Sequence, residues 1–245
     1  MISTLALHGF TGSPRSWDFL PADEISKCVA PALVGHVGAA FAGDVTHFDA
    51  EIDRLAALLP DTGAAHVVGY SLGARLALGL ALRHPGRVSR LTLLSAHPGL
   101  DSPSEREARR ASDGAWCELL LTRGLEAFVD AWQAQPLWAS QASVPAALLR
   151  KKRAERLSQT AVGLVQSLRS TGLGQMPPYL EQLTRLRIPV ALLAGELDGK
   201  FCELARSMTA RLPLAELEIV PGAGHDLLLE RPDLITEVIR RGNQT

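Results

Sequence analysis

Six short apolar runs, separated by segments of helical periodicity, constrain the fold of this 245-residue chain more than any other feature. None of the runs alternates strictly between apolar and polar residues, as a strand with one solvent-facing side would. They therefore predict buried strands of a mostly parallel, doubly wound α/β sheet, with helices on both faces. The expected strands are Ile2–Leu7, Cys28–Leu33, Ala65–Gly69, Leu91–Leu94, Val190–Ala194 and Ala215–Val220, and the clearest helices are Asp49–Leu59 and Gly73–Arg83.

The alternation of strands and helices stops between about residues 99 and 187, where helix-forming residues dominate. We expect this segment to be a helical cap inserted into a single domain that spans residues 1–245. Open α/β sheets bind ligands beyond the carboxyl ends of their strands, so the cap is expected to lie there. The expected cap helices are Ser104–Asp113, Ala115–Thr122, Leu125–Gln135, Pro145–Glu155 and Ala161–Thr171.

The composition argues against several kinds of partner. Lys and Arg number 25 against 26 Asp and Glu, so no global positive field attracts nucleic acid or an anionic membrane. The three cysteines are far apart and show no metal-ligand spacing, so we expect neither a metal nor another cofactor. The apolar N-terminal run is too short for a signal or membrane segment. A cytoplasmic protein with a small-molecule substrate, monomeric or weakly homo-oligomeric, is expected.

Gly69-Tyr70-Ser71-Leu72-Gly73 gives the pattern G-x-S-x-G between an expected strand and an expected helix. In this context the pattern is typical of a nucleophile elbow, a tight turn that lifts a serine hydroxyl out of the sheet. The helix that begins behind the serine favours developing negative charge. Ser71 is therefore the predicted reactive residue, and a chance glycine turn is the alternative.

A serine hydroxyl needs an imidazole to take its proton, and the imidazole needs a carboxylate to fix its tautomer. His225 follows the last expected strand in a glycine-rich loop, and Asp198 follows the strand before it. The resulting chain order Ser, Asp, His is the one expected after such an elbow. The six other histidines compete with His225, whereas Glu196 and Asp101 are the alternatives to Asp198 because each also follows an expected strand.

The segment His8–Ser13 ends the first expected strand, where a loop commonly contributes an oxyanion-hole amide. The backbone amides of Phe10 and Leu72 are the predicted donors. An ordinary strand-to-helix turn capped by Ser13 is the alternative.

Arg75 lies one helical turn after Ser71, so its side chain is expected to face the same pocket. A guanidinium there would suit a carboxylate better than an apolar ester. Two basic clusters in the cap strengthen the expectation of an anionic substrate, although such clusters are often solvated helix faces. They are Arg106, Arg109 and Arg110, and Arg150, Lys151, Lys152, Arg153 and Arg156.

Together these motifs resemble one branch of the α/β-hydrolase superfamily, the 2-succinyl-6-hydroxy-2,4-cyclohexadiene-1-carboxylate synthases of menaquinone biosynthesis. The resemblance spans nearly the whole chain. The motifs that carry it are His8-Gly9-Phe10-Thr11-Gly12-Ser13, Gly69-Tyr70-Ser71-Leu72-Gly73-Ala74-Arg75, His97-Pro98-Gly99-Leu100, Glu107-Ala108-Arg109, Ser112-Asp113, Phe128-Val129-Asp130-Ala131-Trp132 and Gly195-Glu196-Leu197-Asp198-Gly199-Lys200-Phe201.

The resemblance implies an α/β-hydrolase fold and a lyase that removes a proton from a cyclohexene substrate and eliminates pyruvate without hydrolysis. Ser71, primed by His225 and Asp198, would act as the base. The resemblance further implies that arginines bind the carboxylates of a polycarboxylate substrate and that an aromatic pair lines the pocket. The arginines are Arg75, Arg109 and Arg156, and the aromatic residues are Tyr70 and Trp132.

Two other functions use the same fold. A carboxylesterase or carbon–carbon bond hydrolase would employ Ser71 as a nucleophile or to activate water. A binding protein without activity would retain the three catalytic residues without using them.

Overall fold

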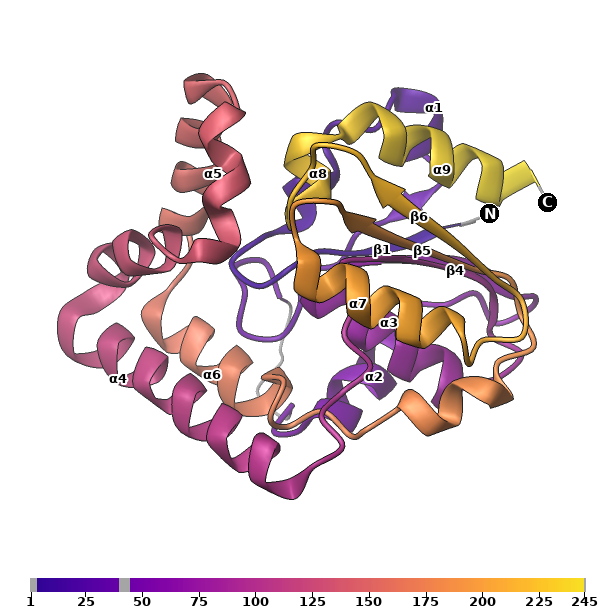
Figure 1. Cartoon of the computed structure of the whole chain (residues 1–245), viewed down its shortest axis with the longest axis horizontal. Coiled ribbons are helices and arrows are strands. Elements are labelled where there is room, and N and C mark those ends of the chain that lie inside the picture. Colours follow the sequence, from indigo (N-terminus) through magenta and orange to yellow (C-terminus); the bar gives the residue numbers. More distant parts are fainter. Residues whose placement is uncertain (1–3, 40–44, 245) are drawn as a thin grey trace.

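One sheet of six parallel strands forms the centre of the protein, whose computed structural model describes residues 4–39 and 45–244 (Figure 1). The strand order is β2-β1-β3-β4-β5-β6, and every neighbouring pair is parallel. The prediction of a doubly wound α/β fold is confirmed. The strands are β1 (Thr4–Leu7), β2 (Cys28–Val29), β3 (Ala65–Tyr70), β4 (Val88–Leu94), β5 (Val190–Gly195) and β6 (Ala215–Val220).

Helices cover both faces of the sheet (Figure 1). On one face lie α1 (Ala22–Ile25), α8 (Leu227–Glu230) and α9 (Pro232–Gln244), and on the other lie α2 (Phe48–Ala56), α3 (Leu72–Arg83) and α7 (Gly199–Thr209). Successive strand residues enter opposite cores: Leu5 and Leu7 pack into one apolar cluster, whereas Ala6 packs into the other. Because side chains alternate across a strand, burial on both faces requires the continuous apolar runs seen in the sequence.

The second strand is much shorter than predicted. Only Cys28–Val29 pairs with β1, whereas the prediction extended to Leu33. Pro31 has no N–H to donate to a ladder, and the Leu33 amide donates instead to His8 Nε2 at 3.2 Å. Residues 2 and 3 of the first predicted strand lie outside the described residues.

The segment α4 (Pro103–Gln133) takes the place of the three helices predicted between Ser104 and Gln135; it consists of two helices that meet at Gly124, so the predicted break between Thr122 and Leu125 is confirmed. The prediction of a break at Gly114 was wrong, because this glycine continues the helix at a modest cost in propensity. Gly124 does interrupt the helical geometry, with a φ of 80° that favours glycine. The run then continues through η2 (Pro136–Ser143), α5 (Ala146–Leu157), α6 (Ala161–Thr171) and η3 (Leu180–Arg185).

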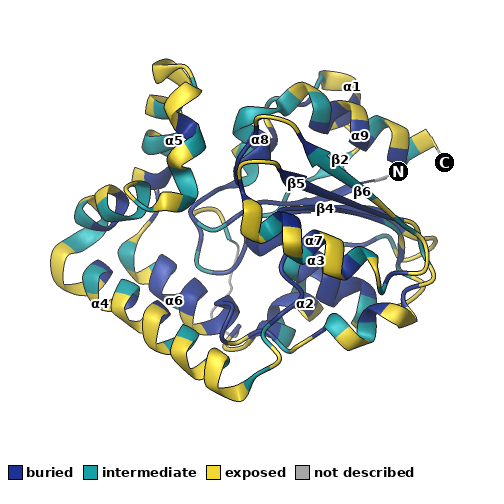
Figure 2. Cartoon of the chain, in the orientation of Figure 1, coloured by how far each residue is buried: buried dark blue, intermediate teal, exposed yellow. Residues whose placement is uncertain are grey.

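The α4–α6 segment lies beside the carboxyl ends of the strands and has a small apolar core of its own (Figure 1). Phe128 of α4 packs there with Leu164 and Leu168 of α6. The outer surfaces of α4 and α5 are largely exposed, whereas β1, β3 and β5 are buried (Figure 2). The edge strands β2 and β6 are only partly buried, so the prediction that they are buried was wrong, because in the described sheet each has a neighbouring strand on one side alone. Within residues 4–39 and 45–244, none of the helices has the length and hydrophobicity needed to cross a bilayer.

Candidate active site

Ser71 stands on a strained turn between β3 and α3. Its backbone has φ 53° and ψ −106°, a region that side-chain-bearing residues rarely adopt, and its amide donates to Leu94 O at 2.9 Å. The flanking glycines are required by packing. A Cβ atom on Gly69 would lie 2.4 Å from Gly73 O, and one on Gly73 would lie 2.1 Å from Leu7 O. The geometry is that of a nucleophile elbow.

The structure brings together the three residues of the predicted triad. His225 Nε2 lies 3.1 Å from Ser71 Oγ, and His225 Nδ1 lies 2.7 Å from Asp198 Oδ2. A carboxylate can only accept, so Nδ1 carries the proton and Nε2 is free to receive the proton of Ser71. The three side chains follow β3, β5 and β6, whose carboxyl ends lie at one edge of the sheet. This arrangement can activate a hydroxyl oxygen as a base or as a nucleophile.

The competing residues of the sequence interpretation have other partners or surroundings. Glu196 is exposed and accepts from the Gly222 amide at 2.9 Å, and Asp101 is exposed before α4. The buried His8 and His36 rings hold backbone groups of neighbouring loops. His66 bonds to Thr92 on the strands, away from the Ser71 hydroxyl. His225 is the imidazole that reaches Ser71.

The predicted oxyanion donors belong to the pocket at Ser71, which Phe10 and Leu72 both line. The surrounding loops are tightly constrained. Thr11 and Ser95 have positive φ values of 65° and 50°, and the Ser95 hydroxyl donates to the His225 carbonyl at 2.9 Å. Such strain persists only where neighbouring contacts fix the backbone.

A cavity of about 190 Å³ opens above Ser71 and holds three cationic side chains. These are Arg75 of α3, Arg109 of α4 and Lys200 of α7. Arg75 Nη1 donates to Thr171 O at 2.9 Å, while Arg109 Nε donates to Asp113 Oδ1 at the same distance. These contacts fix both guanidinium groups and leave other N–H donors for an anion.

Burial and the adjoining Arg109 lower the pKa of Arg75 to about 9, while Asp113 opposes the shift. Arg75 is therefore still charged at neutral pH. Burial raises the pKa of Asp113, against the opposing effect of Arg109. The pocket thus holds more positive than negative charge and suits a polyanionic ligand.

Only some of the predicted aromatic and arginine residues line the cavity. Trp132 lines the cavity, but Tyr70 and Arg156 are not among its lining residues. The Tyr70 ring packs 5.7 Å from the His225 ring, and the Arg156 guanidinium lies 5.0 Å from the centre of the Trp138 ring. Both are almost completely buried, and Tyr70 Oη and two Arg156 nitrogens have no hydrogen-bond partner in the structure. Arg156 therefore lies against Trp138, and Tyr70 against His225.

Lys200, His97 and Trp138 also line the cavity but were not predicted as site residues. Lys200 and His97 occur in motifs of the resemblance and directly follow β5 and β4, a signal that was available in the sequence. His97 Nδ1 accepts from the Gly99 amide at 3.1 Å, and burial, followed by the charges of Arg75 and Lys200, lowers its pKa to about 3. It therefore presents a neutral ring to the pocket. Among the described residues, no cluster of His, Cys, Asp or Glu is suited to hold a metal ion.

The fold and the elbow agree with the family to which the sequence can be matched. The model of the alpha/beta hydrolase family matches residues 5–238, and the chain belongs to this family. A thermophilic esterase from Thermogutta terrifontis, 24% identical, has the same fold with a TM-score of 0.83 over 100% of this chain and 91% of the esterase.

More similar relatives confirm the resemblance to one branch of that family. A 2-succinyl-6-hydroxy-2,4-cyclohexadiene-1-carboxylate synthase of Enterobacter sp. (strain 638) is 32% identical over 92% of this chain and 85% of the relative. A Bacillus subtilis (strain 168) protein, provisionally given the same name, is 35% identical over 97% of this chain and 88% of its own length. The structure of MenH from S. aureus is 29% identical, with a TM-score of 0.92 over 100% of this chain and 96% of that one.

Proposed function

We propose that the protein is a 2-succinyl-6-hydroxy-2,4-cyclohexadiene-1-carboxylate synthase, a lyase of menaquinone biosynthesis. Its substrate would be 2-succinyl-5-enolpyruvyl-6-hydroxy-3-cyclohexene-1-carboxylate. The observation that carries the proposal is a serine–histidine–aspartate hydrogen-bond relay that opens directly into a cavity with three cationic side chains. The names of the relatives support the same reaction.

In the proposed reaction the Ser71 oxygen removes a proton from the substrate ring while its own proton passes to His225 Nε2. The electron pair left on the ring shifts through the conjugated system, forms the diene and breaks the carbon–oxygen bond to the enolpyruvyl group. The departing enolpyruvyl oxygen takes up the proton held by His225, so pyruvate leaves in its enol form and the enzyme returns to its starting protonation state. The Phe10 and Leu72 amides would stabilise the negative charge that develops on the substrate.

The cationic residues would hold the substrate carboxylates away from bulk water. Arg75 and Arg109 are fixed by Thr171 and Asp113, so they lose little conformational freedom when an anion binds. Arg156 would bind a substrate carboxylate if the Trp138 ring that it packs against is displaced when the substrate binds. Tyr70 would line the pocket beside the His225 ring. Trp132 would cover the apolar face of the ring.

We further propose that residues 99–187 act as a cap within one domain, that the protein is cytoplasmic, and that it is a monomer or a weak homo-oligomer. The lining residues Arg109, Trp132 and Thr171 come from the cap, so the cap would select the substrate while the sheet edge performs the chemistry.

The test is pyruvate release from the named substrate by the purified protein and its Ser71→Ala variant. Rapid release that the variant loses is the expected outcome. The alternative, a carboxylesterase or carbon–carbon bond hydrolase, uses the same relay with Ser71 as nucleophile. Absence of pyruvate release by folded protein, together with rapid cleavage of aryl esters, would overturn the lyase and support that alternative.

A further inference from the structure

The helix α5 is attached to the rest of the protein in an unusual way. It projects from the molecule beside the sheet edge, and its outward surface is exposed (Figures 1 and 2). None of its residues belongs to a cluster of buried apolar side chains among the described residues. Polar side chains attach it instead. We call Lys152 and Glu155, which lie one turn apart on α5, together with Gln159 just after the end of the helix, the α5 brace.

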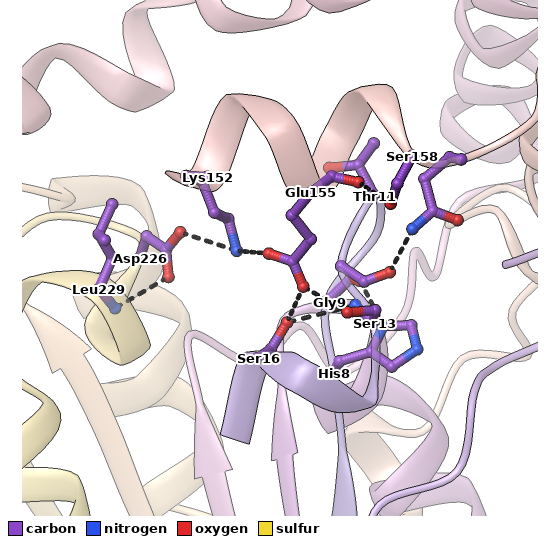
Figure 3. A network of polar contacts seen from close by, with 12 residues as sticks. His8, Gly9, Thr11, Ser13, Ser16, Lys152, Glu155, Ser158, Asp226 and Leu229 are labelled. Atoms are coloured by element: carbon purple, nitrogen blue, oxygen red, sulfur yellow. Dashed lines mark hydrogen bonds and ion pairs between the residues drawn. The ribbon is translucent and has the colours of Figure 1, made fainter. Parts of the chain in front are cut away.

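Glu155 and Gln159 of the α5 brace hold the loop that follows β1. Glu155 Oε1 accepts from the Ser13 hydroxyl at 2.6 Å and from the Ser16 hydroxyl at 2.9 Å (Figure 3). Gln159 Nε2 donates to Gly12 O at 3.0 Å. These bonds join residues about 140 positions apart in the chain, and they lie within a few residues of the Phe10 amide.

Lys152 connects the same network to the loop that carries His225. Its ammonium lies 3.3 Å from Glu155 Oε2 and 3.6 Å from Asp226 Oδ2 (Figure 3). Asp226 is the residue after His225, and its other oxygen accepts from the Leu229 amide at 3.3 Å. The α5 brace therefore links two loops: the Phe10 loop, residues 8–13 after β1, and the His225 loop, residues 221–226 after β6.

Electrostatics favour a charged Glu155 in this position. Burial raises the pKa of this carboxyl, but the Lys152 charge and the hydroxyl donors Ser13 and Ser16 together lower it below its ordinary value. Glu155 is thus ionised at neutral pH, and hydrogen bonds to an ionised acceptor are stronger than neutral ones. The bonds are directional, so they fix the loop position more closely than apolar packing would.

The Phe10 loop needs such support, because Thr11 within it has a positive φ of 65°. Strained backbone persists only when its surroundings over-determine it. The loop is also held by the bond from the Thr11 amide to His36 Nε2 at 3.1 Å, by the short turn from Gly12 N to Gly9 O at 3.0 Å, and by packing of the Phe10 ring on aromatic rings that include Trp132.

We propose that Glu155 is a positioning residue: through the α5 brace it sets the Phe10 amide and His225 at their working distances from Ser71. This inference rests on the proposed function, because its first test measures pyruvate release. It assigns to a helix of the cap a role in the rate of the chemical step, beyond the binding of substrate.

The experiment compares Glu155→Ala and Glu155→Gln in steady-state pyruvate release. Misplacement of a catalytic group by about 1 Å can cost about a hundredfold, so Glu155→Ala is expected to lower kcat by about tenfold to a hundredfold. KM should change by less than about threefold, since Glu155 does not line the cavity. Glu155→Gln keeps an oxygen that accepts from the hydroxyls and should recover most of kcat.

Glu126→Ala is the matched control, because Glu126 is an exposed cap glutamate that forms a long ion pair, at 3.8 Å, with Arg153. It should behave as the unmodified protein. A rise in KM at constant kcat for Glu155→Ala, or equal behaviour of the Ala and Gln variants, would overturn the proposal, because either result indicates that Glu155 only docks the cap.

Two further measurements keep the outcome decisive. If Glu155→Ala does not fold, the double variant Ser13→Ala/Ser16→Ala removes the same bonds from the loop side and should show the same loss of kcat. If the unmodified protein releases no pyruvate, the proposed function fails separately. The α5 brace is then tested on aryl-ester acylation, which uses the same Ser71 and oxyanion donors, and an unchanged acylation rate in Glu155→Ala would contradict it.

Discussion

The sheet edge and the proposed helical cap face each other across one cavity but are built by different means. Ser71, Asp198 and His225 follow the ends of β3, β5 and β6, and β3 and β5 are buried between two apolar cores. The cap segment α4–α6 has only a small apolar cluster, exposes most of its surface and reaches the core through polar side chains such as Glu155 (Figure 2).

This difference separates two tasks. Proton transfer requires atoms held within a few tenths of an ångström, which rigid strands and strained turns provide. Recognition of an anion requires charge near the cavity, and Arg109 can supply it from α4, where Asp113 of the same helix orients its side chain. Substitutions at the sheet edge should therefore affect turnover most, whereas substitutions in the anion-binding groups should affect binding.

The largest effect is expected for Ser71→Ala. Removal of the hydroxyl oxygen leaves no group to accept the substrate proton, so kcat should fall by at least about 10³-fold. The thermal unfolding midpoint should change little, because the side chain is small and partly exposed. Steady-state pyruvate release and circular dichroism measure the two quantities, with the exposed cap serine Ser143→Ala as control. Substantial turnover in Ser71→Ala would remove the sheet edge from the mechanism.

Asp198→Asn should lower kcat by about 10²- to 10⁴-fold, because an amide can no longer fix the His225 tautomer with Nδ1 protonated. Glu196→Gln is the matched control, since Glu196 lies two residues away and its exposed side chain accepts from the Gly222 amide instead of from His225. Both variants are measured at saturating substrate. A larger loss in Glu196→Gln than in Asp198→Asn would exchange the assignments of these two carboxylates.

Arg75→Ala should mainly raise KM, by about 10- to 100-fold, because it removes one charge-assisted contact with the substrate. Arg123→Ala, on the exposed surface of the cap, is the control. Initial rates across a range of substrate concentrations separate KM from kcat. If kcat falls instead and KM is constant, Arg75 acts on the transition state, and the division of tasks between the two regions is weaker than proposed.

The smallest expected effect is a loss of stability at low pH that arises from buried histidines. It again distinguishes the two regions, because residues 99–187 contain no histidine. Burial lowers the pKa of His36 and His66 to about 4. In the unfolded chain each histidine has its ordinary pKa of about 6.5, so below that pH the unfolded chain binds more protons than the native state. Stability is full above that pH and falls as the pH drops towards 4, by about 1.4 kcal/mol per pH unit for each such histidine.

Urea unfolding at pH 7 and pH 5 measures this loss. The variant His66→Gln should lose less stability than the unmodified protein between the two pH values, because one of the buried rings no longer titrates. His47→Gln, on the exposed surface, should leave the difference as it is. An equal pH dependence in all three proteins would show that the His66 ring is accessible to protons in the native state.

The sequence was sufficient for the features that local patterns encode. Continuous apolar runs predict strands buried on both faces, and G-x-S-x-G between a strand and a helix predicts the turn at Ser71, since only glycine fits at Gly69 and Gly73. The chain order of strand ends then brought Asp198 and His225 into consideration, because parallel strands end at one edge. The family resemblance followed from the same motifs.

Only the tertiary structure decided how distant segments meet. It shortened the second strand, because His8 takes the amide of Leu33, and it merged the helices predicted around Gly114 into α4. It placed Arg156 against Trp138 and Tyr70 against His225, and it brought Lys200 and His97 to the cavity. These outcomes depend on contacts between residues far apart in the chain. Local propensity and spacing do not encode such contacts, whereas packing and the pairing of buried polar groups do.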